Sequence, residues 1–227
     1  MKKFLGIASV LALALILGVG SASADTIYTI DNNGGGGLSC CAGPYATANV
    51  QLVDATHATV TFTPLVNGGY QYLLGGVNAV DVNVNATSWT IGSFSGTVPG
   101  AGFQSVNSDL TSGGSGNVGS GFGVFNQTVN NFDGFQHSWT SVSFTLTNTS
   151  GTWADSGSVL TNNGSGFAVA IHGFACATPC TIDSSAISTG FASTGGGVST
   201  PEPASVLLLG FGLSGIGLWG RRKQILA

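Results

Sequence analysis

The sequence predicts an all-β fold, an antiparallel β-sandwich or jelly-roll-like domain, because several of its segments alternate between apolar and polar residues. In the clearest of them, Ala58, Val60 and Phe62 alternate with threonines. Alternation with a period of two places one face of a strand on a core and the other in water, as in antiparallel sheets. Turn pairs such as Asn-Gly and Asp-Gly separate these segments, and no long helical period interrupts them. These features predict about nine short strands in two packed sheets.

The expected elements fill most of residues 25–191. Short helical turns are expected near residues 104–110 and 154–160, and Gly113-Gly114-Ser115-Gly116 is expected to be a mobile loop. Residues 192–200 are rich in Gly, Ser and Thr, which predicts a flexible linker. The alternation predicts that the polar residues of each strand, Asp81 among them, face water. In chain order, the strands are expected at residues 26–31, 47–54, 58–63, 69–74, 80–85, 88–94, 122–130, 141–147 and 166–174.

Charged residues are scarce and unevenly distributed. They make up 6% of the 227 residues, against an average of about 25%. All five basic residues lie at the chain ends, and residues 25–200 contain eight Asp but no Lys, Arg or Glu, a formal charge of 0 − 8 = −8. Nucleic-acid binding is not expected, because no basic patch is present to neutralise phosphates. Solubility must instead come from Asn, Ser, Thr and Gly, with repulsion among the Asp side chains.

The first 24 residues have the composition of a secretory signal peptide. Lys2 and Lys3 precede an apolar run, and Ala22 and Ala24 supply the small residues required before cleavage at Asp25. Signal peptidase is therefore an expected processing partner, and the domain is expected outside the cytoplasm.

The last 27 residues combine a Pro-Glu-Pro motif, an apolar stretch and a basic cluster. Pro201-Glu202-Pro203 precedes residues 204–220, which are followed by Arg221, Arg222 and Lys223. Seventeen helical residues span about 25 Å, close to the short limit for crossing a bilayer core of about 30 Å. The basic cluster acts as a stop-transfer signal on the inner side, so a C-terminal transmembrane helix with the domain on the outer side is expected.

These three parts, in this order, resemble the sorting tail of the PEP-CTERM family. The resemblance covers roughly residues 199–227. It implies a Gram-negative bacterium that makes extracellular polysaccharide, an exosortase that processes the tail, and a final location at the cell surface or in the extracellular matrix. Residues 131–135, 145–154 and 170–180 resemble the type of domain often attached to such tails, which supports the fold and implies no chemistry.

Four cysteines in an exported chain predict disulfides. The short loop Cys176-Ala-Thr-Pro-Cys180 favours a local bridge, which leaves Cys40 and Cys41 as a vicinal pair or reduced. Pairing of Cys40 or Cys41 with Cys176 or Cys180 is the alternative. The spacing departs from that of zinc sites.

No residue pattern indicates a catalytic or metal site. His57, His137 and His172 lack HExxH or HxH spacing, and no GxSxG motif occurs. Asp81–Asn85 superficially resembles a calcium loop but has Ala86 and Gly92 where such a loop requires Gly and Glu.

The sequence is therefore expected to encode a non-enzymatic structural or polysaccharide-associated surface protein, with no cofactor. A calcium-dependent adhesive module and a secreted hydrolase using Asp and His are the alternatives, and a hydrolase should gather two such residues in one concave pocket. Weak contacts with polysaccharide could use Trp89, Trp139 and Trp153, although aromatic residues more often belong to a core.

Overall fold

The computed structural model describes residues 24–194 and 200–201. Residues 25–202 form one compact unit, called the body below. The expected signal peptide up to Ser23, the sorting residues Glu202 and Pro203, the apolar stretch 204–220 and the basic cluster lie outside the described residues. Within the part that is described, no helix has the length and hydropathy needed to cross a membrane.

The body consists of strands joined by loops and a few short 3-10 turns. The turns η1 (Asn107–Asp109) and η3 (Ser156–Ser158) fall where helical turns were expected, and η2 (Phe135–His137) was not expected. The strands of the described residues are β1 (Thr26–Asn32), β2 (Ala46–Asp54), β3 (His57–Pro64), β4 (Val66–Asn67), β5 (Tyr70–Leu74), β6 (Val80–Val82), β7 (Trp89–Thr97), β8 (Thr111–Val118), β9 (Gly123–Asn130), β10 (Ser141–Asn148), β11 (Val169–Ala177), β12 (Ser188–Thr194) and β13 (Thr200–Pro201).

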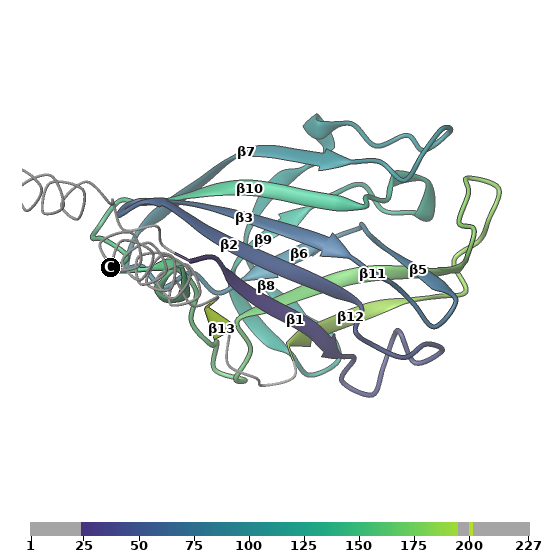
Figure 1. Cartoon of the computed structure of the whole chain (residues 1–227), viewed down its shortest axis with the longest axis horizontal. Helices are drawn as coiled ribbons and strands as arrows, with labels where there is room; N and C mark the ends of the chain where they lie inside the picture. Colours follow the sequence, from purple (N-terminus) through teal and green to yellow (C-terminus); the bar gives the residue numbers. More distant parts are fainter. Residues whose placement is uncertain (1–23, 195–199, 202–227) are drawn as a thin grey trace, which may run out of the picture. The chain divides into compact units, whose positions relative to one another are not determined.

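All strand pairs are antiparallel, which confirms the predicted all-β antiparallel class. The order across the sheet is β7-β10-β3-β2-β1-β12-β11-β6-β9-β8, with β5 beside β11, β4 beside β5 and β13 beside β1. The prediction of two separate sheets is corrected, because β1 is hydrogen bonded to both β2 and β12 and so makes the sheet continuous. Figure 1 shows the sheet curling on itself, with β7, β10, β3 and β2 in front of β6, β8 and β9.

The main core fills the space between these two halves of the curled sheet. Phe62 of β3 and Phe144 of β10 stack with ring centroids 6.3 Å apart. They belong to the same buried cluster as Val80 and Val82 of β6 and Ile171 of β11. The alternating residues predicted for these strands therefore face a common core, and their burial is the main source of stability.

Asp81 contradicts the expected alternation of buried and exposed residues. It lies between Val80 and Val82 but is fully buried. The reason is that β6 is an interior strand, paired with β11 on one side and β9 on the other. Its second face is covered by another apolar cluster, called the second cluster below, whose buried members are Val118, Phe122, Phe125 and Ala170, with Phe167 and Phe191 packed against them.

The glycine-rich segment 113–116, expected to be a mobile loop, is part of β8. Gly114 pairs with Thr128 and Gly116 with Phe125 of β9. A Cβ atom on Gly116 would lie only 2.6 Å from Cγ2 of Thr128. Glycine is required here because a side chain would separate the two strands.

The expected linker over residues 192–200 is corrected at its two ends, and residues 195–199 lie outside the described residues. Ala192, Ser193 and Thr194 belong to β12 and are buried between β11 and β1. Thr200 and Pro201 form β13, which pairs with Ile27 and Thr26. Small residues that suggest a flexible segment in isolation fit here because interior strands leave little room beside them.

Candidate functional site

An open depression of about 650 Å³ lies where β6 and β10 end. One wall is the segment after β6 and the other is the segment after β10, with contributions from β9 and η3. Its lining residues are Asn83, Val84, Asn85, Ala86, Thr87, Asn126, Asn148, Ser150, Gly151, Thr152, Trp153, Ala154, Ser158 and Thr161.

Backbone and amide hydrogen bonds hold the first wall in place. Beyond the end of β6, the Asn126 side chain replaces a strand partner: the Val84 N–H donates to Asn126 Oδ1 at 2.7 Å, and Asn126 Nδ2 donates to the Val84 carbonyl at 2.9 Å. On the other side, the N–H groups of Asn85 and Thr161 donate to the carbonyls of Val159 and Asn83, both at 2.9 Å. The wall is therefore fixed from both sides before any ligand is present.

Trp153 fixes the second wall against the first. Its Nε1–H donates to the Asn85 carbonyl at 2.8 Å, and the side chain is only 3% exposed. Asn85 in turn donates from Nδ2 to the Ser158 carbonyl at 2.9 Å. Trp153 thus links the two walls of the depression. Trp139 is likewise buried in the core, and Trp89 is half-buried with its Nε1–H bonded to Gln127 Oε1.

Several polar groups of the depression remain available to a ligand. Within the described residues, the side chains of Asn83, Thr87, Thr152 and Thr161 make no hydrogen bond; Thr87, Thr152 and Thr161 are exposed, and Asn83 is half-buried. Amides and hydroxyls both donate and accept hydrogen bonds. None of the fourteen lining residues is ionisable, so the depression offers neutral hydrogen-bonding groups and has no side chain suited to acid–base catalysis.

Residues 145–154, one of the segments noted in the sequence as support for the fold, contribute directly to this site. Asn148 and residues 150–154 line the depression. The residues of the calcium-like segment do not lie together. Asn83 and Asn85 line the depression, whereas Asp81 is buried inside the sheet. In the described part of the chain, no group of three or more His, Cys, Asp or Glu residues is arranged to hold a metal ion.

The Asp and His residues do not converge in the depression. His57 Nδ1 lies 2.8 Å from Asp54 Oδ2 on the exposed turn between β2 and β3. Hydrogen bonds from the Thr56 backbone N–H and hydroxyl lower the pKa of Asp54 to about 2. His172 lies elsewhere, stacked on Phe191, and burial lowers its pKa. The arrangement expected of a hydrolase is therefore not present at this site.

Each of the two disulfides joins cysteines that are close in the sequence. Cys176, at the end of β11 and fully buried, is bonded to Cys180, with their Cα atoms 5.8 Å apart. Cys40 is bonded to Cys41, with Cα atoms 3.7 Å apart. This vicinal pair lies in the loop of residues 33–45, which joins β1 to β2.

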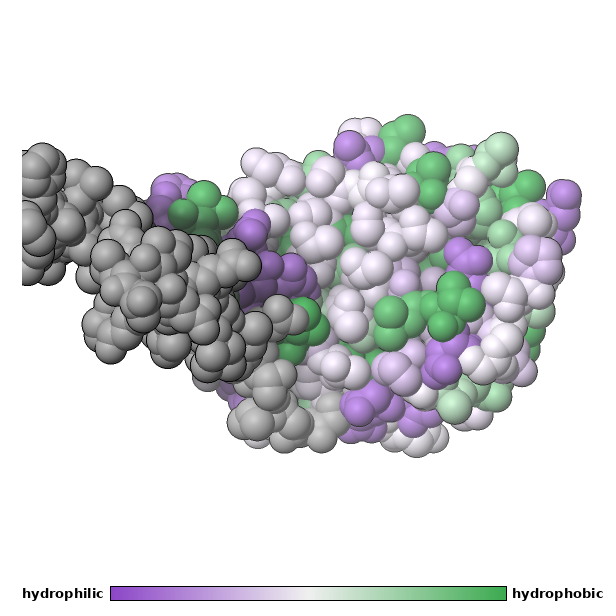
Figure 2. All heavy atoms as spheres, viewed as in Figure 1, coloured by the Kyte–Doolittle hydropathy of each residue, from purple (hydrophilic) through white to green (hydrophobic). Residues whose placement is uncertain are grey.

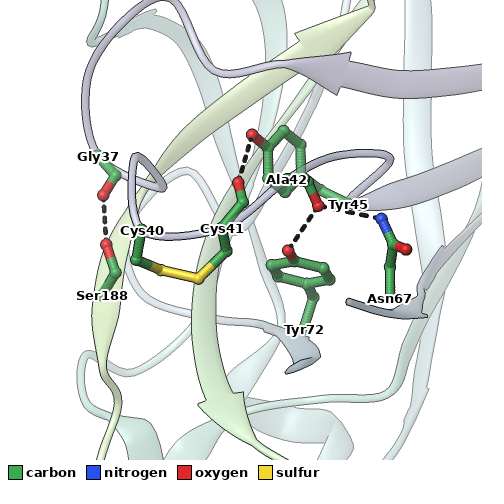
Figure 3. The surroundings of a disulfide bond; sticks show 8 residues. All are labelled: Gly37, Cys40, Cys41, Ala42, Tyr45, Asn67, Tyr72 and Ser188. Atoms are coloured by element: carbon green, nitrogen blue, oxygen red, sulfur yellow. Dashed lines mark hydrogen bonds between the residues drawn. A yellow bond between two sulfur atoms is a disulfide. The ribbon is translucent and has the colours of Figure 1, made fainter. Parts of the chain in front are cut away.

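Three side chains donate hydrogen bonds to the backbone carbonyl groups of Cys41 and Ala42 (Figure 3). The Tyr45 hydroxyl donates to the Cys41 carbonyl at 3.1 Å, and the Tyr72 hydroxyl donates to the Ala42 carbonyl at 2.9 Å. Asn67 Nδ2 also donates to the Ala42 carbonyl, at 3.0 Å. Sequence reasoning did not identify this clamp, since nothing near Cys40 in the sequence points to residues 67 and 72.

Comparison with known proteins identifies one region of the chain. Residues 199–223 match the model of the PEP-CTERM protein-sorting motif. No curated protein and no solved structure matches the chain.

Proposed function

Because the chain carries a PEP-CTERM sorting motif, which implies an exported protein sorted by an exosortase, we propose that its body is a non-enzymatic surface module. In this proposal the body associates with neutral extracellular polysaccharide through the depression between residues 83–87 and 148–154. Signal peptidase removes residues 1–24, and the C-terminal tail holds the protein in the membrane until the exosortase acts on it.

The observation that carries this proposal is the chemistry of the depression. Its lining supplies amides, hydroxyls and backbone groups without any charged side chain. Sugar hydroxyls form hydrogen bonds with the same groups, and a neutral site does not have to desolvate an ion when the ligand binds. The acidic body, which has no Lys or Arg between residues 25 and 200, disfavours polymers rich in carboxylates through like-charge repulsion.

The surface of the body supports the same function. Figure 2 shows a face covered mainly by residues of intermediate hydropathy, with apolar residues in small separate patches. Hydroxyl and amide groups suit many weak contacts with a hydrated polymer. A non-enzymatic role is consistent with the separation of His57 and His172 from the depression.

Binding can be tested by affinity electrophoresis of the full chain in detergent through gels that contain a neutral glucan or a polyuronate. We expect retardation by the neutral polymer alone. Thr152→Val and Thr161→Val keep the side-chain shape but remove a hydroxyl, so each should weaken binding about fivefold, the value of one hydrogen bond of about 1 kcal/mol. Thr90→Val, at an exposed position of β7 outside the depression, is the matched control. Equal retardation of all variants, or of the protein by both polymers, would refute the proposal.

Sorting requires a separate test in the native host. Cell fractionation with and without the exosortase, combined with mass spectrometry of the C-terminus, should show a shortened tail only when the enzyme is present. An intact tail and the same location in both strains would exclude the sorting step without affecting the binding result.

A further inference from the structure

The two cysteines of the vicinal disulfide differ in their exposure to solvent. Cys40 is exposed, whereas Cys41 is only 6% exposed and belongs to the main core. A thiolate attacks a disulfide along the line of the sulfur–sulfur bond, so access decides which sulfur is attacked. Because Cys40 is the more exposed residue of the pair, we expect an external thiolate to reach its sulfur first.

The loop that carries the pair is held independently of the disulfide. Leu38 is fully buried, and the Cys41 N–H donates to its carbonyl at 3.2 Å. On the other side the loop packs directly on β12: a Cβ atom on Gly37 would lie 2.4 Å from the Cα atom of Gly190, and the Ser188 hydroxyl donates to the Gly37 carbonyl. Together with the clamp made by Tyr45, Tyr72 and Asn67, these contacts fix the loop without a cross-link.

The disulfide itself contributes little to the stability of the fold. A cross-link stabilises a protein mainly by restricting the unfolded chain, and this effect decreases as the closed loop becomes shorter. The Cys40–Cys41 bridge spans a single peptide bond. Restriction of the unfolded chain therefore does not explain this disulfide, and its chemical reactivity is the more relevant property.

We propose that Cys40–Cys41 is a thiol-exchange site that accepts an external thiol on Cys40. The incoming thiolate sulfur forms a bond with Cys40 Sγ, the bond between Cys40 and Cys41 breaks, and Cys41 leaves as a thiolate that takes a proton from water. One disulfide is lost and one is formed, so the step needs no oxidant or reductant. This inference is independent of polysaccharide binding.

Cys41 also makes the exchange reversible. After the first step its thiol remains beside Cys40, because the Tyr45 and Tyr72 hydrogen bonds act on the backbone carbonyls and not on the sulfur atoms. A thiol held next to a mixed disulfide attacks it at a high effective concentration. Cys41 is thus the resolving cysteine, and its burial protects it from the external thiol.

Charge selects among the incoming thiols. The body has eight Asp and no Lys or Arg between residues 25 and 200. Its negative field slows the approach of anionic thiols and speeds that of cationic ones, and added salt reduces the difference. Cysteamine should therefore react faster than glutathione at low ionic strength.

The test uses the full chain, oxidised and purified in detergent, incubated at pH 8 with graded cysteamine. The reaction is then quenched with acid, free thiols are alkylated and peptides are identified by mass spectrometry. We expect the cysteamine adduct on Cys40 and alkylation of Cys41 at about tenfold lower cysteamine than is needed to modify Cys176 or Cys180. A parallel arm with a cysteine-containing peptide distinguishes a small thiol from a polypeptide thiol as the partner.

Two single variants isolate access from the rest of the reaction. Cys41→Ser leaves the exposed Cys40 thiol, and Cys40→Ser leaves the buried Cys41 thiol. We expect alkylation at least about tenfold faster for Cys41→Ser, with circular dichroism showing that both variants are folded. An adduct on Cys41, earlier modification of the Cys176–Cys180 pair, equal alkylation of the two variants, or no adduct on the folded protein would overturn the proposal.

Discussion

The two faces of strand β6 have very different surroundings, although they belong to three consecutive residues. Val80 and Val82 face the main core, which is built from apolar side chains. Asp81 points to the other face; its register partners are Ala170, a member of the second cluster, and Thr128. Both oxygen atoms of the Asp81 carboxyl group lack a hydrogen-bond partner within the described residues. Both faces of β6 are therefore buried, but one carries apolar side chains and the other carries this carboxyl group.

The difference has an electrostatic consequence. A carboxylate without a cation or a hydrogen bond is costly to bury, and the body contains no Lys or Arg that could compensate it. Burial therefore raises the pKa of Asp81 well above its usual value, and the group is held as the neutral acid. Ionisation of Asp81 would therefore destabilise the second face of β6.

Truncation of one aromatic residue on each face is the strongest way to compare the two clusters. Phe62→Ala removes a fully buried ring from the main core, and we expect a loss of about 3–5 kcal/mol in the free energy of unfolding. Phe125→Ala should lie near the lower end of that range, because the half-buried Phe167 and Phe191 can move into the space. Denaturant unfolding followed by tryptophan fluorescence measures both. A larger loss for Phe125→Ala would contradict the ranking.

Gly116→Ala tests the close packing of β8 on the face that carries Asp81. The new methyl group would meet Cγ2 of Thr128 at 2.6 Å, and overpacking of this kind costs roughly 1–3 kcal/mol. Thr128→Ser removes that methyl group, so the double variant should recover most of the lost stability. If Gly116→Ala alone is neutral in thermal unfolding, the glycine requirement argued for β8 is wrong.

Asp81→Asn should change the dependence of stability on pH. Above about pH 4, the folded state keeps a proton that the unfolded state has lost, so stability falls as pH rises, by up to about 1.4 kcal/mol per pH unit. The fall continues until the pH reaches the raised pKa of the folded state. Asn keeps the shape but cannot ionise, and unfolding curves measured from pH 5 to 8 should lose this slope. An unchanged slope would show that Asp81 is not the responsible group.

Asp54→Asn provides the opposite sign at an exposed position. Hydrogen bonds from Thr56 lower the pKa of Asp54 to about 2, so the folded state favours the ionised form. Its contribution is present above about pH 4 and is lost as the pH falls toward 2. The variant should flatten only the acid limb of the stability curve, by less than any effect above. An effect of Asp54→Asn between pH 5 and 8 would contradict this assignment.

Sequence patterns predicted the strands in which apolar and polar residues alternate, because the alternation itself marks the buried face. β3 and β10 follow the alternation of Val60, Phe62 and Phe144, and both occur as expected. Alternation does not reveal whether the second face of a strand is also covered, which is why Asp81 was expected in water. Covering of that face depends on Phe122 and Phe191, which come from segments about 40 and 110 residues further along the chain.

Strands made of small residues were missed for a related reason. Gly113–Gly116 and Ala192–Thr194 carry no apolar period, and only the neighbouring strands make their small size useful. The depression was not predicted, because residues 145–154 stood out in the sequence only as support for the fold. Its other wall depends on Asn126 bonding to Val84, a contact set by tertiary packing that local patterns do not encode.

The pairing of β13 with β1 places the first and last strands of the body side by side. Thr26 lies opposite Pro201, directly before the rest of the sorting motif. The hydroxyls of Thr26 and Ser156 are 2.8 Å apart, so η3 and the depression it lines belong to this same end of the sheet. The loop with Cys40 begins seven residues later, roughly 20 Å along β1. The proposed polymer site therefore lies near Pro201, whereas the loop with Cys40 follows the other end of β1.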